Sequence, residues 1–188
     1  MRHLSKILIA LGANLQTGER SLAQTVHAAS QALATEHVRV TATSRLFASP
    51  CFPAGAGPDY VNAAAVLETA LTPQDLLAHL HDVEATFRRE RQTRWGRRTL
   101  DLDLLAYGDL VLPDLATQIE WRNLPARDQS LQTPQTLILP HPRIQDRAFV
   151  LVPLADIAPD WRHPILGQTV AQMLALLDPA DIRAVTPL

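Results

Sequence analysis

Two aspartates, Asp101 and Asp103, interrupt a run of leucines near the middle of the chain. If this run is a β-strand, both carboxylates project from one face and the leucines between them from the other. Carboxylates on an otherwise apolar strand need a partner that neutralises them, and Mg²⁺ binds one or two carboxylates together with substrate phosphates. The pair is therefore a candidate magnesium site. The open alternative is an edge strand whose charges prevent aggregation.

A dense group of arginines comes directly before these aspartates. It consists of Arg88, Arg89, Arg91, Arg94, Arg97 and Arg98. Guanidinium groups suit phosphate oxygens, although arginines at a helix C-terminus can simply complement the helix dipole, and a nucleic-acid patch is a third interpretation. Because Arg98 lies three residues before Asp101, acidic and basic groups come close together. A metal-bound polyphosphate between them would satisfy both signs of charge, so the combination predicts a polyphosphate site.

Aromatic side chains lie at the ends of predicted strands and in loops, where they can stack on a flat heterocycle. They are Phe52, Tyr60, Trp95 and Phe149. Core packing is the ordinary alternative for any one of them. Asn62 shares a strand face with Tyr60, and its amide carries both a donor and an acceptor for the edge of a ring.

Composition excludes several other classes of protein. The chain has 188 residues, 47% of them hydrophobic, a formal net charge of −2 and one cysteine, Cys51. A single cysteine rules out an internal disulfide, and Lys6, the only lysine, does not lie in a P-loop motif. The acidic balance disfavours a nucleic-acid partner. Since neither a signal peptide nor a membrane span is apparent, we expect a cytoplasmic protein that does not bind membranes.

The elements that would position these residues follow a recognisable order. We predict strands at 7–12, 37–47, 60–69 and 99–107, a short strand at 137–139, and a strand or extended segment at 147–154. Helices are predicted at 19–36, from Thr72 to Phe87, and at 169–177, with Thr72 as N-cap followed by Pro73. The β-α-β-β-α-β order predicts an α/β (α+β) fold with a ferredoxin-like core. We expect one domain over 1–188, with an exposed insertion at about 113–136.

Four segments together resemble the 6-hydroxymethyl-7,8-dihydropterin pyrophosphokinase (HPPK) family of folate biosynthesis. They are A-L-G-A-N-L at 10–15, P-D-Y-V-N-A-A at 58–64, R-W-G-R-R-T-L-D-L-D-L-L at 94–105 and L-P-H-P-R-I-Q-D-R-A-F-V-L-V-P-L at 139–154. The resemblance implies a three-layer α-β-α sandwich. It also implies transfer of the terminal diphosphate of ATP to a reduced pterin, with release of AMP.

The resemblance further implies roles for individual residues. Asp101 and Asp103 match the ligands of two Mg²⁺ ions, and Arg89 and Arg98 match arginines that assist the transfer. The ATP contacts would be Leu77, Glu84, Arg91, Arg94, Leu104, His141 and Arg147. The pterin contacts would be Ser49, Pro50, Phe52, Tyr60, Asn62, Trp95 and Phe149, with Tyr60 and Phe149 on either side of the ring. Without the resemblance, Glu84 would be interpreted as a charge on a helix surface.

Two other functions remain open on the residues alone. One is a small RNA-binding ferredoxin-like module, which would use the arginines for phosphates and exposed aromatics for bases. The other is a nucleotidyltransferase with the same aspartate pair. We favour the diphosphate transferase, acting on small molecules and expected to be a monomer.

Overall fold

The computed structural model describes residues 5–16, 18–51, 57–87, 99–125, 128 and 132–188. The strands are β1 (Ser5–Ala13), β2 (Val38–Thr43), β3 (Phe47–Ser49), β4 (Tyr60–Thr69), β5 (Asp101–Tyr107) and β6 (Thr186–Pro187). The helices are α1 (Leu22–Ala32), α2 (Pro73–Thr86), α3 (Leu115–Asn123), the 3₁₀ helix η1 (Ile144–Asp146), α5 (Ala148–Ile157), α6 (Val170–Ala175) and α7 (Pro179–Arg183).

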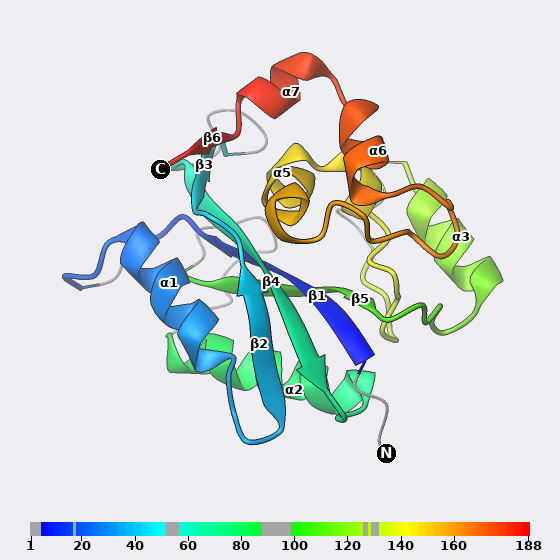
Figure 1. The fold of residues 1–188 in the computed structure, drawn as a ribbon, viewed down its shortest axis with the longest axis horizontal. Helices are drawn as coiled ribbons and strands as arrows, with labels where there is room; N and C mark the ends of the chain where they lie inside the picture. The colour runs from blue at the N-terminus through cyan, green and yellow to red at the C-terminus, as the bar shows by residue number, and fades with distance from the viewer. Residues whose placement is uncertain (1–4, 17, 52–56, 88–98, 126–127, 129–131) are drawn as a thin grey trace.

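One antiparallel sheet forms the centre of the molecule (Figure 1). Its strand order is β5-β1-β4-β3-β6, and β2 also pairs with β4. β2 and β3 therefore act as one bent strand, interrupted where the Ser44 hydroxyl accepts a hydrogen bond from the Ala64 N–H (2.9 Å). Counted in this way, the sheet has the order of a ferredoxin-like fold, as predicted.

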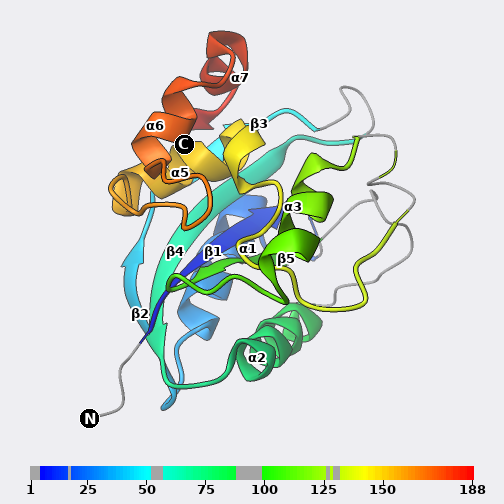
Figure 2. The ribbon, with the colours of Figure 1, turned by 90° about the vertical axis from the view of Figure 1, so that its right-hand side faces the viewer.

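Helices cover both faces of the sheet, so the three-layer sandwich is confirmed. α1 and α2 pack on the face that carries Ala63, Ala65 and Leu67, whereas α5 and α6 pack on the face that carries Ala64 and Val66. In Figure 2, α5 and α6 lie above the sheet and α2 lies below it. Alternate side chains of β4 therefore belong to two separate hydrophobic cores, one on each face of the sheet.

The local signals at the helix starts are confirmed. The Thr72 hydroxyl accepts a hydrogen bond from the Asp75 N–H (3.1 Å), and Pro73 is the first helical residue. Ser21 and Gln24 form a capping box at α1, which begins at Leu22, three residues later than predicted. These bonds satisfy N–H groups that the first turn of a helix leaves unpaired.

The prediction of a strand or extended segment over 147–154 is wrong, because this region forms α5. Its residues are rich in β-branched and aromatic side chains and include Pro153, all of which disfavour a helix. Burial overrides this local preference. Val150, Leu151 and Leu154 are all at most 2% exposed, between the sheet and α6, so the segment lacks the polar face that reveals most helices.

Two further regions differ in detail from the predictions. The described residues of segment 113–136 are exposed or half-buried apart from Gln118, which is fully buried in α3. The predicted strand at 137–139 is reduced to one antiparallel bridge between Leu112 and Leu139.

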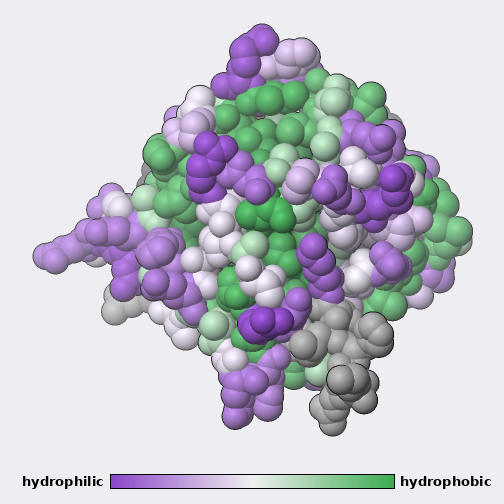
Figure 3. All heavy atoms as spheres, in the orientation of Figure 1, coloured by the Kyte–Doolittle hydropathy of each residue, from purple (hydrophilic) through white to green (hydrophobic). Residues whose placement is uncertain are grey.

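The surface in Figure 3 is polar around α1, while apolar atoms are scattered among polar ones near α5, α6 and α7. Among the helices that the structure describes, none has the length and apolar character to cross a bilayer.

Candidate active site

The two aspartates of β5 lie on the α5 side of the sheet. Asp101 pairs in register with Gly12 of β1, and Asp103 pairs with Ala10. Both carboxylate residues are half-buried, while Leu102 and Leu104 point into the core beneath α2. β5 is an edge strand, which agrees with part of the alternative interpretation. The aspartate side chains, however, project from the face of the sheet rather than from its edge.

A row of residues crosses the sheet from these carboxylates. Gly12 pairs with Asp101 on one side and with Asn62 of β4 on the other. Residues directly opposite each other in an antiparallel sheet share a face, and neighbouring strands lie about 4.8 Å apart. Asn62 therefore lies two strand spacings, about 10 Å, from Asp101 on the same face.

The amide of Asn62 is held by a neighbour. Asn62 is only 4% exposed, and its Nδ2 donates a hydrogen bond to the hydroxyl of Ser49 (2.8 Å). Ser49 pairs with Tyr60, which is half-buried on the same face. This bond fixes the orientation of the amide, so that its Oδ1 and second N–H are directed consistently. Ser49, Tyr60 and Asn62 thus form one connected group.

The first turn of α5 lies over this face of the sheet. Arg147 precedes α5, and its guanidinium carbon lies 5.7 Å from the ring centre of Phe149. Burial lowers the pKa of Arg147, and the nearby Asp103 is the strongest of the groups that raise it. Arg147 therefore connects the carboxylates electrostatically with an aromatic ring.

His141 is fixed beside β5 by its backbone and its ring. Its N–H donates to the carbonyl of Leu105 (2.8 Å), and its Nδ1 accepts a hydrogen bond from the N–H of Arg143 (3.1 Å). Burial, followed by the charges of Arg147 and Arg143, lowers the pKa of His141 to about 3. The imidazole is therefore neutral near pH 7, and because Nδ1 accepts, the proton is on Nε2.

Glu84 attaches α2 to the outer edge of β5. It is 1% exposed, and its Oε1 accepts a hydrogen bond from the N–H of Leu102 (2.8 Å). The interpretation of Glu84 as a surface charge is therefore wrong. Leu77 of α2 is half-buried, and the side chain of Leu104 is 4% exposed in the core. Any contact from Leu104 to a ligand must therefore use its backbone.

Comparison of the sequence with known proteins identifies its family. Residues 8–159 match the family model described as 7,8-dihydro-6-hydroxymethylpterin-pyrophosphokinase (HPPK). The chain belongs to this family. A relative from Methylorubrum extorquens, named 2-amino-4-hydroxy-6-hydroxymethyldihydropteridine pyrophosphokinase, is 35% identical over 97% of this chain and 99% of its own length. A Synechocystis relative of the same name is 42% identical over 69% of this chain, which spans only 56% of that relative.

Solved structures support the HPPK fold. The crystal structure of Plasmodium falciparum HPPK-DHPS, wild type with pterin and p-hydroxybenzoate, matches 93% of this chain with a TM-score of 0.65 and 13% identity. The matched region is 43% of that longer chain. At this identity the likeness concerns the fold alone.

Several predicted site residues of this HPPK family member lie outside the described residues. They are Phe52, Arg89, Arg91, Arg94, Trp95 and Arg98. Of the remaining pterin contacts, Pro50 is exposed directly after β3. The structure therefore brings together Ser49, Tyr60 and Asn62 as one group, and Asp101, Asp103 and Arg147 as another.

Two residues of this site were missed by the sequence analysis. Gly12 separates Asp101 from Asn62, and a Cβ atom built on it would lie 3.4 Å from Asn62 Oδ1. Asn14 is 3% exposed, and its Nδ2 donates to the carbonyl of Pro58 (3.2 Å), which ties the end of β1 to the loop before β4. Both lie in the segment 10–15. The glycine and asparagine of this segment were the only features in the sequence that could have indicated their part in the site.

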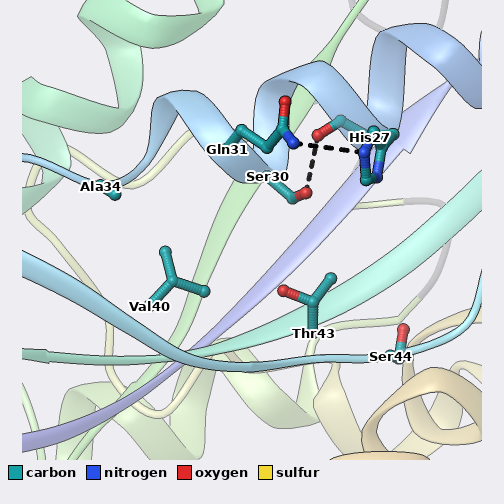
Figure 4. Close-up of a pocket in the computed structure, with 7 residues that line it drawn as sticks. All are labelled: His27, Ser30, Gln31, Ala34, Val40, Thr43 and Ser44. Carbon is teal, nitrogen blue, oxygen red and sulfur yellow. Dashed lines mark hydrogen bonds between the residues drawn. The ribbon is translucent and has the colours of Figure 1, made fainter.

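A cavity of about 500 Å³ lies elsewhere, between α1 and β2 (Figure 4). It is lined by His27, Ser30, Gln31, Ala34, Val40, Thr43 and Ser44. Val40 packs with the core beneath α1 and α2, so the cavity lies on the opposite side of the sheet from the carboxylates. The His27 ring and the Gln31 amide already contact each other at its rim (3.3 Å). We assign this cavity no part in the HPPK site.

Proposed function

We propose that this protein transfers the terminal diphosphate of ATP to the hydroxymethyl group of 6-hydroxymethyl-7,8-dihydropterin, giving the pterin diphosphate and AMP for folate biosynthesis. The observation that carries the proposal is the row Asp101–Gly12–Asn62. In this proposal the metal and the phosphates bind at Asp101 and the edge of the pterin ring at Asn62, about two strand spacings apart on one face. Membership of the family supplies the reaction.

The carboxylates of β5 fit a magnesium site. Asp101 and Asp103 offer hard oxygen donors on one face, and no group of three histidine, cysteine or acidic side chains suited to a metal occurs within the described part of the chain. Mg²⁺ commonly binds in this way, with a few carboxylates and with phosphate oxygens or water in its other positions. We propose that the two aspartates hold two Mg²⁺ ions with the nucleotide. When bound, the ions would neutralise charge on the phosphate oxygens.

The pterin ring is proposed to lie over Asn62, between Tyr60 and Phe149. Aromatic faces favour stacking on a flat ring, and the ordered amide of Asn62 can hydrogen-bond its edge. Ser49 orients that amide, whereas Pro50, Phe52 and Trp95 are proposed to complete the pocket. The hydroxymethyl group then points along the row toward the carboxylates.

The nucleotide is proposed to lie along the outer edge of β5. Its contacts would come from Leu77 and Glu84 on α2, the backbone of Leu104, and the side chains of His141 and Arg147, together with Arg91 and Arg94. The neutral His141 can donate its Nε2 proton to a phosphate oxygen, and Arg147 can oppose phosphate charge. Arg89 and Arg98 are proposed to stabilise the charge that develops during transfer.

The mechanism depends on position and electrostatics. The pterin hydroxyl oxygen forms a bond to the β-phosphorus of ATP and loses its proton to water. The bond between the β-phosphorus and the oxygen that bridges to the α-phosphate breaks, and that oxygen leaves with AMP. Phosphoryl transfer depends mainly on positioning and charge stabilisation, so the proposal assigns no strong general base.

Product analysis tests the proposal. Purified protein, MgATP and the reduced pterin should yield equal amounts of AMP and pterin diphosphate, measured by chromatography. Asp101→Asn serves as the inactive control. Release of pyrophosphate would instead indicate nucleotidyl transfer, and salt-dependent RNA binding without turnover would indicate the RNA-binding module.

We also propose a monomer that acts in the cytoplasm. Every residue named for the site comes from one chain, so a single copy supplies the full set. Light scattering of the purified protein at micromolar concentration tests this, and a dimeric mass would contradict it.

A further inference from the structure

The segment from Leu112 to Leu139, which connects β5 to η1, has its two ends paired with each other. Leu112 and Leu139 exchange two backbone hydrogen bonds, of 2.9 and 3.1 Å. The intervening residues therefore leave the body of the protein and return to it, carrying α3 with them. No residue of α3 belongs to the proposed site.

α3 buries a polar side chain and exposes an apolar one. Gln118 is 0% exposed, whereas Leu115 in the same helix is 54% exposed. The Nε2 of Gln118 donates a hydrogen bond to the carbonyl of Pro140 (3.1 Å). A helix that served only to cover the core would bury Leu115 instead, because apolar burial supplies most of the stability of packed helices. A buried directional bond fixes the position of the group that it contacts.

The other end of α3 makes a second contact of the same kind. The backbone carbonyl of Arg122, in the last turn, accepts a hydrogen bond from Nη1 of Arg143 (3.1 Å). Such carbonyls have no partner within their own helix, so an external donor is favourable. Nη1 of Arg143 also lies 3.2 Å from Asp146 Oδ2, which continues the chain of contacts into η1.

His141 lies between the two residues that α3 holds. Pro140 precedes it, and the N–H of Arg143 is the donor to its Nδ1 (3.1 Å). The direction of the imidazole therefore depends on the positions of Pro140 and Arg143. Gln118 and the Arg122 carbonyl fix both of these positions from one helix.

We propose that α3 positions His141 for the polyphosphate of ATP, with Gln118 as the positioning residue. The inference rests on the proposed function, since it assigns α3 to the nucleotide half of that site. Gln118 touches neither substrate. It acts through the Pro140 carbonyl, and the pterin group at Ser49, Tyr60 and Asn62 is independent of it.

The test compares Gln118→Met with Glu120→Met, which places the same side chain on the exposed side of the same helix. Methionine has nearly the volume of glutamine but cannot donate to Pro140. We expect Gln118→Met to weaken binding of Mg²⁺-α,β-methylene-ATP and to raise the KM for ATP about tenfold, the scale of one lost hydrogen bond to a buried group. Pterin affinity should change less than about twofold, and the ¹⁵N shifts of the His141 ring should move. Glu120→Met should match the wild type in every measurement.

Unchanged nucleotide affinity in a folded Gln118→Met protein overturns the inference. An equal loss of nucleotide and pterin affinity also overturns it, because such a loss would indicate general destabilisation. If Gln118→Met does not fold, Gln118→Asn applies the same criteria, because its amide is one methylene too short to reach Pro140. The analogue-binding comparison needs no turnover. A wild type that binds the analogue but forms no AMP therefore contradicts the proposed function while still testing α3, and a wild type that does not bind the analogue contradicts both.

Discussion

Replacing Gly12 with alanine should make the protein more stable and less active. Gly12 is the next-to-last residue of β1 and is paired with a strand on each side, and glycine in a strand costs about 0.5–1 kcal/mol relative to alanine because it loses more backbone freedom on folding. An added Cβ would meet Asn62 Oδ1 at 3.4 Å and Tyr60 Cδ1 at 3.8 Å, which are ordinary contact distances. The sheet can therefore accept the methyl group without rearrangement.

The same methyl group would occupy the floor of the proposed pterin pocket. It stands against the acceptor oxygen of Asn62, whose Oδ1 and remaining N–H would serve the edge of the ring. Displacing the ring from these two hydrogen bonds costs about 0.5–1.5 kcal/mol for each, or about 1–3 kcal/mol together. We therefore expect pterin affinity to fall by roughly tenfold to hundredfold.

Two measurements on Gly12→Ala check this reasoning. Urea unfolding should give a free energy of unfolding about 0.5–1 kcal/mol above that of the wild type, and titration with the reduced pterin should show the loss of affinity. Ala48→Val is the matched control, since Ala48 lies on β3 between Phe47 and Ser49 and faces the other side of the sheet. A Gly12→Ala protein that binds pterin like the wild type would show that the ring does not lie over Gly12.

Further predictions concern the metal strand, its attachment to α2 and the acid limit of stability. Asp103→Asn should lower the rate of AMP formation at least about 100-fold, because it removes one of the two carboxylate charges available to Mg²⁺. Its circular dichroism spectrum should be unchanged. A normal rate at saturating Mg²⁺ would contradict the metal assignment. Glu84→Ala should lower the free energy of unfolding by about 1–3 kcal/mol, since the buried N–H of Leu102 loses its acceptor, whereas Glu84→Gln keeps an acceptor and should cost less in the same urea titration. Burial, and secondarily Arg122, lowers the pKa of His163 to about 4, so between pH 6.5 and 4 the unfolded chain binds a proton that the folded protein does not. Stability should then fall as pH drops through this range, by up to about 1.4 kcal/mol per pH unit, and equal pH slopes for His163→Asn and the wild type would refute the assignment.

The sequence was sufficient to predict the features that depend on local patterns. The alternation along β4 predicted two faces, and both are buried against different helices. The Thr72–Pro73 start of α2 also followed from sequence, as did the common face of Asp101 and Asp103. In each case the feature is determined by residues that lie within a few positions of one another in the sequence.

The features that were missed depend on contacts between distant segments. The first eight residues of α5 are all apolar because they pack between the sheet and α6, so this part of the sequence carries no helical period. Gln118 gave no signal because a buried glutamine in a polar segment looks like a surface residue until its partner, Pro140, is known. Glu84 was misjudged for the same reason, since its acceptor role depends on the position of β5.

A β-bulge in the β1–β5 ladder explains how one strand serves both halves of the site. Ile9 pairs with Leu104, but Leu8 pairs with Ala106, so Leu105 is an extra residue. The N–H of Leu102 points away from β1 to Glu84, and in a regular ladder the backbone of Leu105, three residues later, would point toward β1. The bulge instead frees the Leu105 carbonyl to accept the N–H of His141 (2.8 Å). Before the bulge, β5 presents its carboxylates on the sheet face, and at the bulge it anchors the segment that carries His141 and Arg147. The register irregularity therefore lets one strand both carry Asp101 and Asp103 on the sheet face and hold the segment that contains His141 beside them.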